Sequence, residues 1–481
     1  MSEIRTRFAP SPTGYMHIGN LRTALYAYLV AKKEKDGVFI LRIEDTDQGR
    51  LVEGATDIIY ETLKQCGLKH DEGPDVGGPV GPYVQSERVH AGIYMDYAKK
   101  LIRLGGAHYC FCDEETLSAS REAEGDSFKF NDPCKNLTVE EAEARVAAGE
   151  SFVVRQTIPE GTTSFNDEVF GTITVDNSTL DESVLIKSDG FPTYNFANVV
   201  DDHLMGITDV VRGMEYLSSA PKYNLIYEAF GWDIPRYIHC PPVMKDEHSK
   251  LSKRNGDASF QDLVAKGYLP EAILNYIALL GWAPETNQEI YTLEELTQAF
   301  NVKRINTSGA IFDPVKLTSI NGLWLRNMDL DSYYQLVKPY IDQAVKGDFD
   351  GKKIAAVVQV RANTLNEIPE MLDFLDTFPE YSNDLYNHKK MKSNPEVALV
   401  SLKAARELLA GENDWTQSAL HEHLMELPAK LGMKNGQVLF PLRLAITGKQ
   451  STPGGAIEIA EILGKEETLR RLDLSIAQLE K

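Results

Sequence analysis

The sequence predicts a multidomain α/β protein in which a parallel-sheet fold is split by an insertion and followed by an all-helical C-terminal region. Three observations predict this. Strand-like and helical patterns alternate at the N-terminus, the character of the chain changes between about 86 and 191, and the chain beyond Asn327 has mostly helical periodicity. A length of 481 residues also indicates several domains.

The N-terminal alternation centres on VFILRIED (38–45), an apolar run that reads as a buried strand with an acidic end. Helical patterns flank it at 21–34 and 53–66. Strands that alternate with helices in this way are typical of a parallel sheet. A Gly/Pro-rich loop follows at 72–83.

After the insertion, VVDDHLMGITDVVRG (199–213) returns to a strand-like pattern, and a helix is expected near 217–230. The parallel-sheet part of the fold is therefore expected on both sides of the insertion. In the C-terminal region the amphipathic helical stretches are 331–346, 352–366, 396–411 and 417–432.

Composition favours a soluble globular protein of a reducing compartment. The chain is 43% hydrophobic, has five cysteines and contains no apolar run of membrane-spanning length. Its net charge of −21, from 50 Lys and Arg against 71 Asp and Glu, gives no overall electrostatic footprint for nucleic acid. Net charge sets solubility more than specific binding, so this balance neither supports nor excludes a nucleic-acid partner.

Two short stretches carry phosphate-binding character. The first is RFAPSPTGYMHIGN (7–20), a loop with Pro and Gly that runs into a helix-compatible segment. Free backbone N–H groups and the helix dipole favour an anion at such a helix start, and His17 and Asn20 can donate to phosphate oxygens. An ordinary strand-to-helix turn is the alternative for this stretch taken alone.

The second stretch is KLSKR (250–254), where three basic residues precede an Asn-Gly turn. A basic loop can neutralise the charge that builds on a triphosphate in the transition state. Taken alone, it could equally be a solvated basic cluster. The two stretches together, in this order, favour ATP chemistry.

The chain resembles the bacterial-type glutamyl-tRNA synthetases, which are class I aminoacyl-tRNA synthetases, over essentially its whole length. The matching stretches are RFAPSPTGYMHIGN, LRIEDTD, DEGPDVGGPVGPYVQSER, LIKSDGFPTYNFANVVDDHLMGITDVVRG, KLSKR, LPEAILNYIALLGW and PLRLAITG. The resemblance implies ATP-dependent ligation of L-glutamate to tRNA(Glu) through glutamyl-adenylate, with Mg²⁺ accompanying ATP. It also implies a monomeric, cytoplasmic enzyme without membrane contact. The alternatives are a non-discriminating enzyme that also glutamylates tRNA(Gln) and an inactive paralogue that only binds ATP or tRNA.

The same resemblance implies a domain order. A Rossmann-type catalytic domain is split by an acceptor-end-binding insertion, and a connecting domain leads to helical anticodon-binding subdomains. The implied ranges are 1–85 and 192–250 for the two catalytic halves, 86–191 for the insertion, 251–326 for the connecting domain, and 327–383 and 384–481 for the anticodon-binding subdomains.

Glutamate carries two carboxylates and one ammonium, so its site should offer two Arg forks and one acid. Arg7 and Arg212 stand at the ends of two expected strands and Glu44 ends a third. Ligands of open α/β sheets bind at the carboxyl ends of strands. The resemblance places the glutamate site at Arg7, Ala9, Ser11, Glu44, Tyr194, Asn198 and Arg212.

The resemblance also implies an ATP site. Its residues are His17, Gly19, Asn20, Glu215, Tyr216, Lys250, Ser252 and Lys253. The catalytic members of this set are His17, Gly19, Asn20, Lys250 and Lys253. They act by positioning and by electrostatic stabilisation, and no protein nucleophile is needed.

Cys110, Cys112 and Cys134 have the spacing of metal ligands. Some relatives carry zinc in this insertion with a fourth ligand two residues after the third cysteine, where this chain has Asn136, a poor zinc ligand. His108, Tyr109, Asp113 and Asp132 are the other candidates for a fourth ligand. Three thiols left from a lost site are the alternative, and we expect less than one zinc per chain. Cys66 and Cys240 are expected in the core.

In the C-terminal region the resemblance implies anticodon contacts by Arg443, Thr452 and Pro453. Arg361 lies near the position where some relatives use an arginine to reject the glutamine anticodon, and an exposed helix charge is the alternative. The sequence leaves discrimination between tRNA(Glu) and tRNA(Gln) open.

Overall fold

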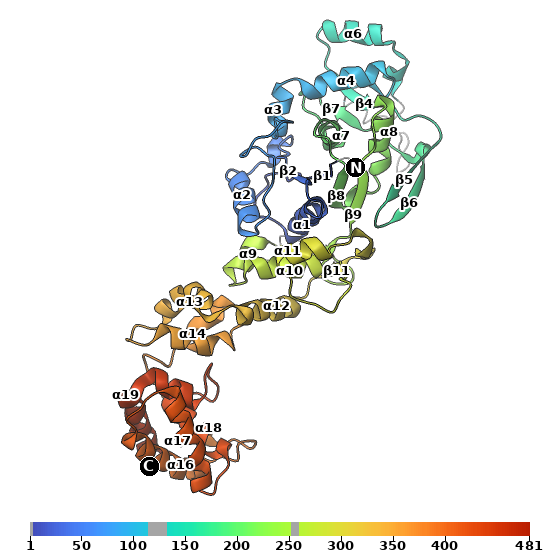
Figure 1. Cartoon of the computed structure of the whole chain (residues 1–481). Helices are drawn as coiled ribbons and strands as arrows, with labels where there is room; N and C mark the ends of the chain where they lie inside the picture. Colours follow the sequence, from blue (N-terminus) through green and yellow to red (C-terminus); the bar gives the residue numbers. More distant parts are fainter. Residues whose placement is uncertain (1–2, 114–131, 252–258) are drawn as a thin grey trace. The chain divides into compact units, whose positions relative to one another are not determined.

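The computed structural model describes residues 3–113, 132–251 and 259–481 (Figure 1). The chain forms two compact units. Unit 1 contains residues 1–264 and 270–313, and unit 2 contains residues 265–269 and 314–481. The finer division into six ranges stays a prediction.

The central sheet of unit 1 is parallel at its core, as expected. β1 (Arg5–Phe8) pairs in parallel with β2 (Val38–Leu41). A four-stranded sheet has the order β6-β5-β9-β8, and its members are β5 (Thr162–Asp167), β6 (Gly171–Asp176), β8 (Asp209–Gly213) and β9 (Arg236–Cys240). The amide of Thr208 donates to the carbonyl of Arg5 over 2.9 Å, which places β1 beside β8.

The β5–β6 hairpin comes from the expected insertion, yet it extends the sheet of the catalytic half. β5 pairs in parallel with β9, with Asp167 opposite Tyr237. The rest of the insertion forms its own antiparallel sheet, β3-β4-β7, made of β3 (Ala107–Cys110), β4 (Val153–Gln156) and β7 (Val184–Ile186). The insertion is thus joined to the catalytic sheet by hydrogen bonds as well as by the chain.

Helices surround these sheets and supply the core. Those that begin before Pro314 are α1 (Ile18–Lys32), α2 (Ala55–Gln65), α3 (Gln85–His90), α4 (Ile93–Arg103), α6 (Val139–Ala147), α7 (Tyr194–Leu204), α8 (Ala220–Phe230), α9 (Phe260–Ala265), α10 (Pro270–Leu279) and α11 (Leu293–Ala299). Helix α1 packs against β1, β2 and β8 and also against α10 and α11. Because α1 is covered on several sides, its own buried residues are distributed around the helix and it has no continuous polar face.

One expectation was wrong. The segment 199–213 reads as strand-like, but its first part belongs to helix α7, and only Asp209–Gly213 forms a strand. The β-branched pair Val199 and Val200 favours a strand locally. Tertiary packing reverses this preference, because the helix buries both valines together with Asp201 and Asp202, whose carboxylates pair with buried arginines.

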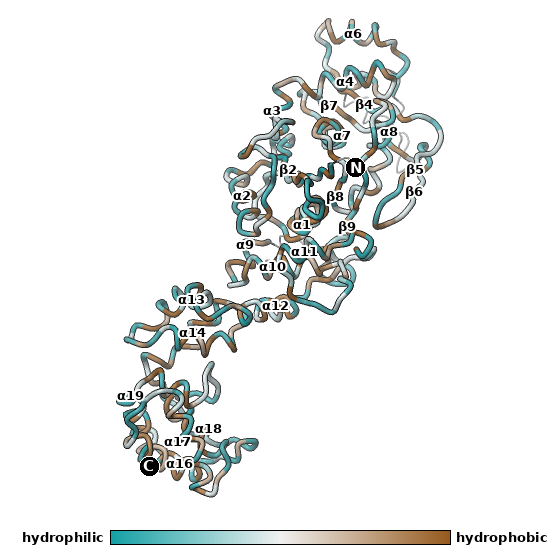
Figure 2. The backbone as a smooth tube through the Cα atoms, viewed as in Figure 1, coloured by the Kyte–Doolittle hydropathy of each residue, from teal (hydrophilic) through white to brown (hydrophobic). Residues whose placement is uncertain are grey.

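Unit 2 is helical, as expected. Its helices are α12 (Pro314–Asn327), α13 (Leu330–Ala344), α14 (Gly351–Gln359), α15 (Ile368–Met371), α16 (Pro395–Gly411), α17 (Gln417–Lys430), α18 (Asn435–Thr447) and α19 (Ala456–Leu479). Figure 2 shows hydrophobic and hydrophilic residues alternating along these helices, typical of amphipathic packing. The stretch expected as one helix at 352–366 ends at Gln359.

Short strands complete the described chain. β10 (Val243–Met244) pairs in parallel with β11 (Ala310–Ile311). Within the described ranges no helix is both long enough and apolar enough to cross a membrane.

Candidate active site

A cavity of about 590 Å³ opens at the carboxyl ends of β1 and β8 and at the N-terminus of α1. Nearly all of the residues that the sequence assigns to glutamate and ATP line it. These are Arg7, Ala9, Ser11, His17, Gly19, Asn20, Glu44, Tyr194, Arg212, Glu215, Tyr216 and Lys250. Residues up to 244 positions apart in sequence, from Arg7 to Leu251, therefore face one space.

His17 connects the two stretches to which the sequence assigns phosphate binding. It caps helix α1, and its Nδ1 accepts a hydrogen bond from the amide of Gly19 over 3.0 Å. An amide N–H can only donate, so in the neutral ring the proton lies on Nε2. Nε2 donates to the backbone carbonyl of Leu251 over 3.1 Å. This places the ring between the start of α1 and the residue that follows Lys250.

Lys250 stands on a short hairpin that begins at β10. The amide of Leu251 donates to the carbonyl of Val243 over 3.0 Å, and Asp246 accepts backbone hydrogen bonds from the turn. The hairpin sets Lys250 at the rim of the cavity. Ser252 and Lys253, the other members of the basic stretch assigned to ATP, lie outside the described residues.

Arg7 is almost completely buried, with 4% of its surface exposed. Its Nε donates to Oδ1 of Asp202 over 3.0 Å and its Nη1 to the carbonyl of Val211 over 3.2 Å. Burial alone would raise the pKa of Asp202, but Arg7 and Arg42 outweigh it and hold the pKa below its ordinary value. A buried carboxylate therefore fixes the direction of the Arg7 side chain.

Arg212 is oriented by a neutral partner. Its Nε donates to Nε2 of His239 over 3.0 Å. The rings of Tyr223 and Tyr237 lie 4.7 and 5.0 Å from its guanidinium carbon. Its Nη2 is buried and has no hydrogen-bond partner among the described residues. A buried donor without a partner is costly, so this atom is suited to receive a carboxylate oxygen of a ligand.

Glu44 is the acid of the cavity. Nη2 of Arg42 donates to its Oε1 over 3.1 Å. Burial raises the pKa of Glu44 to about 6, although Arg42 and Arg7 act in the opposite direction. The group is therefore ionised near neutral pH and can accept from an ammonium group.

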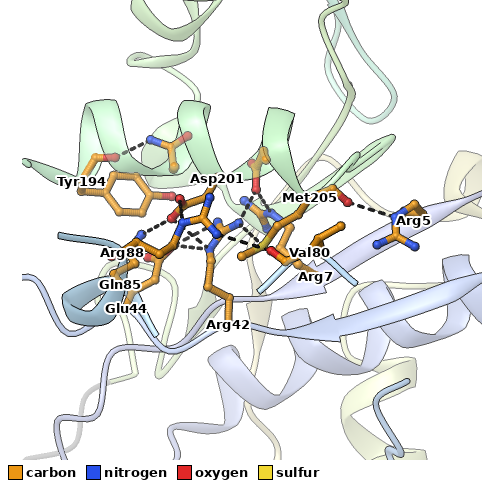
Figure 3. A network of polar contacts seen from close by, with 12 residues as sticks. Arg5, Arg7, Arg42, Glu44, Val80, Gln85, Arg88, Tyr194, Asp201 and Met205 are labelled. Atoms are coloured by element: carbon orange, nitrogen blue, oxygen red, sulfur yellow. Dashed lines mark hydrogen bonds and ion pairs between the residues drawn. The ribbon is translucent and has the colours of Figure 1, made fainter. Parts of the chain in front are cut away.

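Sequence reasoning missed the network behind these residues, which is drawn in Figure 3. Arg42 is fully buried and donates through Nη1 to Asp202 over 2.8 Å. Nε of Arg88 lies 2.7 Å from Oδ1 of Asp201, and the side chain of Gln85 donates to Oδ2 of Asp201 over 2.8 Å. The available signal was charge inside apolar runs, namely the arginine of LRIED and the two acids of VVDD.

Asn198 takes a different place from the rest of the set. It lies one turn after Tyr194 on α7, and its Nδ2 donates to the carbonyl of Tyr194 over 2.6 Å. It is buried and is not among the residues that line the cavity. Tyr194 itself stacks on Tyr216 with ring centroids 4.7 Å apart.

In the insertion, the side chains of Cys110, Cys112 and Cys134 gather with that of Asp132. One ligand atom from each lies within 4.8 Å of all the others. The sulfurs of Cys112 and Cys134 are 3.8 Å apart, and Oδ1 of Asp132 lies 3.6 Å from the Cys112 sulfur. Three thiols and one carboxylate form a donor set that zinc accepts in tetrahedral geometry. Of the candidates for a fourth ligand, the structure brings Asp132 to the cysteines, and Asn136 is not part of the group.

The anticodon candidates lie in unit 2. Arg361, Thr452 and Pro453 line one groove of about 420 Å³ together with Lys449. Arg443 does not line this groove, and its Nη2 donates to the carbonyl of Gln450. Burial, and then the charge of Arg361, lower the pKa of Arg443, so the two cations act on one another.

Two family descriptions match the chain. "tRNA synthetases class I (E and Q), catalytic domain" covers residues 3–319, and "Anticodon binding domain" covers residues 332–476.

Among curated proteins, the chain is similar to a glutamate–tRNA ligase of Clostridium tetani, with 61% identity over 99% of this chain and 98% of that protein. A glutamate–tRNA ligase of Clostridium acetobutylicum is 58% identical over 100% of this chain and 99% of that protein. Among solved structures, a glutamate tRNA ligase of Elizabethkingia meningosepticum in complex with its amino acid matches with a TM-score of 0.88 and 35% identity, over 99% of this chain and 100% of that one.

Proposed function

Because the chain belongs to the class I tRNA synthetases for glutamate and glutamine, and within them to the glutamate–tRNA ligases, we propose that it joins L-glutamate to tRNA(Glu) through glutamyl-adenylate. The observation that carries the proposal is the meeting of Arg7, Arg212 and Glu44 in one cavity with His17 and Lys250. The similar Elizabethkingia protein is a glutamate tRNA ligase with its amino acid bound.

The charges of the cavity match those of glutamate. Two carboxylates would meet Arg7 and the buried Nη2 of Arg212, and the ammonium would meet Glu44. Ala9 and Ser11, on the loop after β1, line the same space and would add backbone and hydroxyl contacts. Tyr194 covers the site from α7, and Asn198 would act through Tyr194, because its side chain donates to the Tyr194 carbonyl.

ATP would lie at the N-terminus of α1. Its phosphates would meet Gly19, Asn20 and Lys250, and the adenosine would lie near Glu215 and Tyr216. Lys253 and Ser252 would complete the phosphate contacts. Mg²⁺ would enter with ATP and offset part of the phosphate charge.

The reaction would need no protein nucleophile. An oxygen of the glutamate α-carboxylate forms a bond to the α-phosphorus, the bond between the α-phosphorus and the bridging oxygen breaks, and pyrophosphate leaves. The terminal ribose hydroxyl of tRNA then attacks the adenylate carbonyl, and AMP leaves with the bonding electrons. The residues of the cavity hold the reacting groups in line and stabilise the charge that develops on the phosphates.

The same proposal includes a zinc site in the insertion. Cys110, Cys112, Cys134 and Asp132 would hold the ion, which would link strand β3 to the segment at 132–134. This differs from the expectation of less than one zinc per chain. That expectation rested on Asn136, which stands two residues after Cys134. In the group that the structure brings together, the fourth donor is Asp132, two residues before Cys134. The ion would serve the fold and would lie outside the chemistry described above.

Binding of tRNA would use both units. We propose that the insertion holds the acceptor end and that Arg361, Arg443, Thr452 and Pro453 contact the anticodon. The groove shared by Arg361, Thr452 and Pro453 supports this, and Lys449 lines it together with the acids Glu367 and Glu370. We further propose that the enzyme acts as a monomer in the cytoplasm, which light scattering after size exclusion would test for the oligomeric state.

The decisive experiment is aminoacylation with labelled glutamate and separate transcripts of tRNA(Glu) and tRNA(Gln). We expect charging of tRNA(Glu), and glutamate-dependent ATP–pyrophosphate exchange that rises strongly when tRNA is added. Charging of both transcripts at similar rates would identify a non-discriminating enzyme. Absence of exchange and of charging would contradict the proposed function.

A further inference from the structure

Three buried side chains from three adjacent strands form a continuous hydrogen-bonded chain that ends at the cavity. Strand β9 lies between β5 and β8, and His239 stands on β9 opposite Arg212 of β8. Nε of Arg212 donates to Nε2 of His239 over 3.0 Å, and Nδ1 of His239 lies 2.7 Å from Oδ2 of Asp167 at the end of β5. His239 is fully buried.

The chemistry of the partners decides where the proton of His239 lies. The Nε of arginine carries a hydrogen and can only donate, so Nε2 of His239 must accept. The proton of the neutral ring is then on Nδ1 and points at Asp167, which as a carboxylate can only accept. Burial lowers the pKa of His239, and although Asp167 opposes this, Arg212 adds to it, so the ring stays neutral at neutral pH.

Asp167 is itself held in place. Its Oδ1 accepts hydrogen bonds from the amides of Val169 and Phe170, each over 2.9 Å. Its Oδ2 also accepts from the amide of His239 over 3.2 Å. The carboxylate is therefore fixed by backbone groups of the β5–β6 turn and of strand β9, and it presents a rigid acceptor to the imidazole.

The two arginines of the cavity are thus held by opposite means. Arg7 is paired with the carboxylate of Asp202, which offsets part of its charge. Arg212 forms no salt bridge within the described part of the chain, and its hydrogen bond goes to a neutral ring. A neutral orienting partner leaves the full positive charge of Arg212 to a ligand, and its buried Nη2 has no partner among the described residues.

We propose that Asp167 and His239 are positioning residues for glutamate recognition: Asp167 fixes the Nδ1–H tautomer of His239, and His239 in turn directs Arg212 at a substrate carboxylate without neutralising it. The proposal rests on the proposed function, in which Arg212 binds glutamate. It also gives the insertion a part in the amino-acid site, because Asp167 belongs to the hairpin that the insertion contributes to the sheet.

The test begins with Asp167→Asn. The asparagine oxygen can still accept from the turn amides, but its NH₂ group then faces Nδ1 and forces the proton to Nε2, where it opposes the N–H of Arg212. We expect the KM for glutamate to rise roughly 10- to 100-fold, since hydrogen bonds to charged groups have this magnitude. The KM for ATP should stay within about threefold of the wild-type value, because a side-chain change outside the ATP site usually has an effect no larger than this.

A pair of substitutions at His239 provides rescue. His239→Leu removes the acceptor for Arg212 and should raise the KM for glutamate as Asp167→Asn does. His239→Gln keeps a side-chain oxygen for Arg212 and should recover most of the loss. Asp176→Asn, at another turn carboxylate of the same hairpin that accepts from the amide of Ser178, is the matched control and should leave the KM for glutamate unchanged.

Nitrogen-15 NMR of histidine-labelled full-length protein gives a readout that does not depend on activity. The signal that disappears in His239→Gln belongs to His239. It should report a proton on Nδ1 in the wild type and on Nε2 in Asp167→Asn. A wild-type proton on Nε2, or wild-type KM values for glutamate in both Asp167→Asn and His239→Leu, would overturn the inference. Failure of the proposed function would instead appear as absent exchange in the wild type, while the NMR result would still decide the tautomer.

Discussion

The imidazole of His17 donates a hydrogen bond to the backbone carbonyl of Leu251 over 3.1 Å. The same ring accepts from the amide of Gly19, so one side chain connects the start of helix α1 with the hairpin that bears Lys250. Two stretches that are 234 residues apart at this contact are therefore held at one edge of the cavity. The position of the basic hairpin depends on a residue that also shapes the helix N-terminus.

The basic stretch should contribute charge stabilisation to adenylate formation. Lys253→Ala is expected to lower the rate of glutamate-dependent ATP–pyrophosphate exchange by roughly 10²- to 10³-fold while the melting temperature stays near that of the wild type. Lys245→Ala, on the hairpin that bears Lys250 but not among the residues that line the cavity, is the matched control and should exchange normally. Near-normal exchange by Lys253→Ala would show that the basic stretch has another role.

Arg7 should matter for glutamate far more than for ATP. Arg7→Ala leaves a substrate carboxylate without its partner, so the KM for glutamate should rise roughly 10- to 100-fold, with a much smaller change in the KM for ATP. Arg5→Ala removes an arginine from the same strand whose guanidinium pairs instead with Glu72 over 2.9 Å. This control should keep a normal KM for glutamate. Equal losses for both substrates in Arg7→Ala would point to a disturbed fold.

Glutamate binding should weaken in acid. The pKa of Glu44 is raised by burial to about 6, above the ordinary 4.5, with Arg42 and Arg7 opposing the shift and Asp201 adding to it. As the pH falls through about 6, Glu44 is protonated and the substrate ammonium loses its partner, so the KM for glutamate should rise up to about tenfold per pH unit. The effect of Glu44 on folding has the opposite sign. Its pKa is higher in the folded protein than in the unfolded chain, so the folded state binds the proton more tightly. The contribution of Glu44 to the free energy of unfolding therefore increases as the pH falls from 6 to 4.5.

The matched variant for this prediction is Glu44→Gln. It keeps the shape of the side chain and removes its titration, so its KM for glutamate should be high and should lack the rise below pH 6. A wild-type KM that stays constant from pH 7.5 to pH 5.5 would contradict the assignment of Glu44 to the ammonium.

The cysteine cluster should bind metal with Asp132 as the fourth ligand. Elemental analysis of the full-length protein should return about one zinc per chain, the stoichiometry of a tetrahedral Cys₃Asp site. Cys110→Ser and Asp132→Ala should each lose most of the zinc and lower the melting temperature. Asn136→Ala should keep it. Loss of zinc in Asn136→Ala together with retention in Asp132→Ala would reverse the ligand assignment, and a zinc-free wild type would remove the site.

Arg361 should influence which tRNA is charged. If its guanidinium rejects the glutamine anticodon, Arg361→Ala should raise the ratio of kcat/KM for tRNA(Gln) over tRNA(Glu), by roughly 5- to 30-fold for a lost discrimination of about 1–2 kcal/mol. Lys353→Ala, which removes a cation from helix α14 just before Arg361, is the control and should leave the ratio unchanged. A uniform loss for both tRNAs in Arg361→Ala would indicate a phosphate contact.

The residues that line the cavity could be predicted from sequence because their chemistry and their local setting coincide. Arg7, Glu44 and Arg212 stand at or just after strands, where parallel sheets place ligand-binding groups, and His17 stands at a helix start. The helical C-terminal region was also predictable, since amphipathic periodicity is a local property.

The prediction that failed was a strand-like first part of the segment 199–213, where tertiary packing reversed the local preference. The valines of VVDD favoured a strand, but helix α7 forms because its acids neutralise buried arginines. The acids inside the apolar run signal buried charge, but their partners cannot be identified locally, since the partner of Asp202 on β1 is 195 residues away.

The sequence by itself determined which residues line the cavity, because motifs of this kind require given residue types at given spacings. Only the tertiary structure decided how those residues are aimed. Asp202 behind Arg7 and His239 behind Arg212 lie in strands and helices where an isolated acid or histidine is indistinguishable from a surface residue. Likewise, the path of the chain brings Asp132 and its near neighbour Cys134 to Cys110 and Cys112. Hydrogen bonds of this kind are stronger where water is excluded. Which residues are buried depends on the whole fold, so the sequence alone does not identify them.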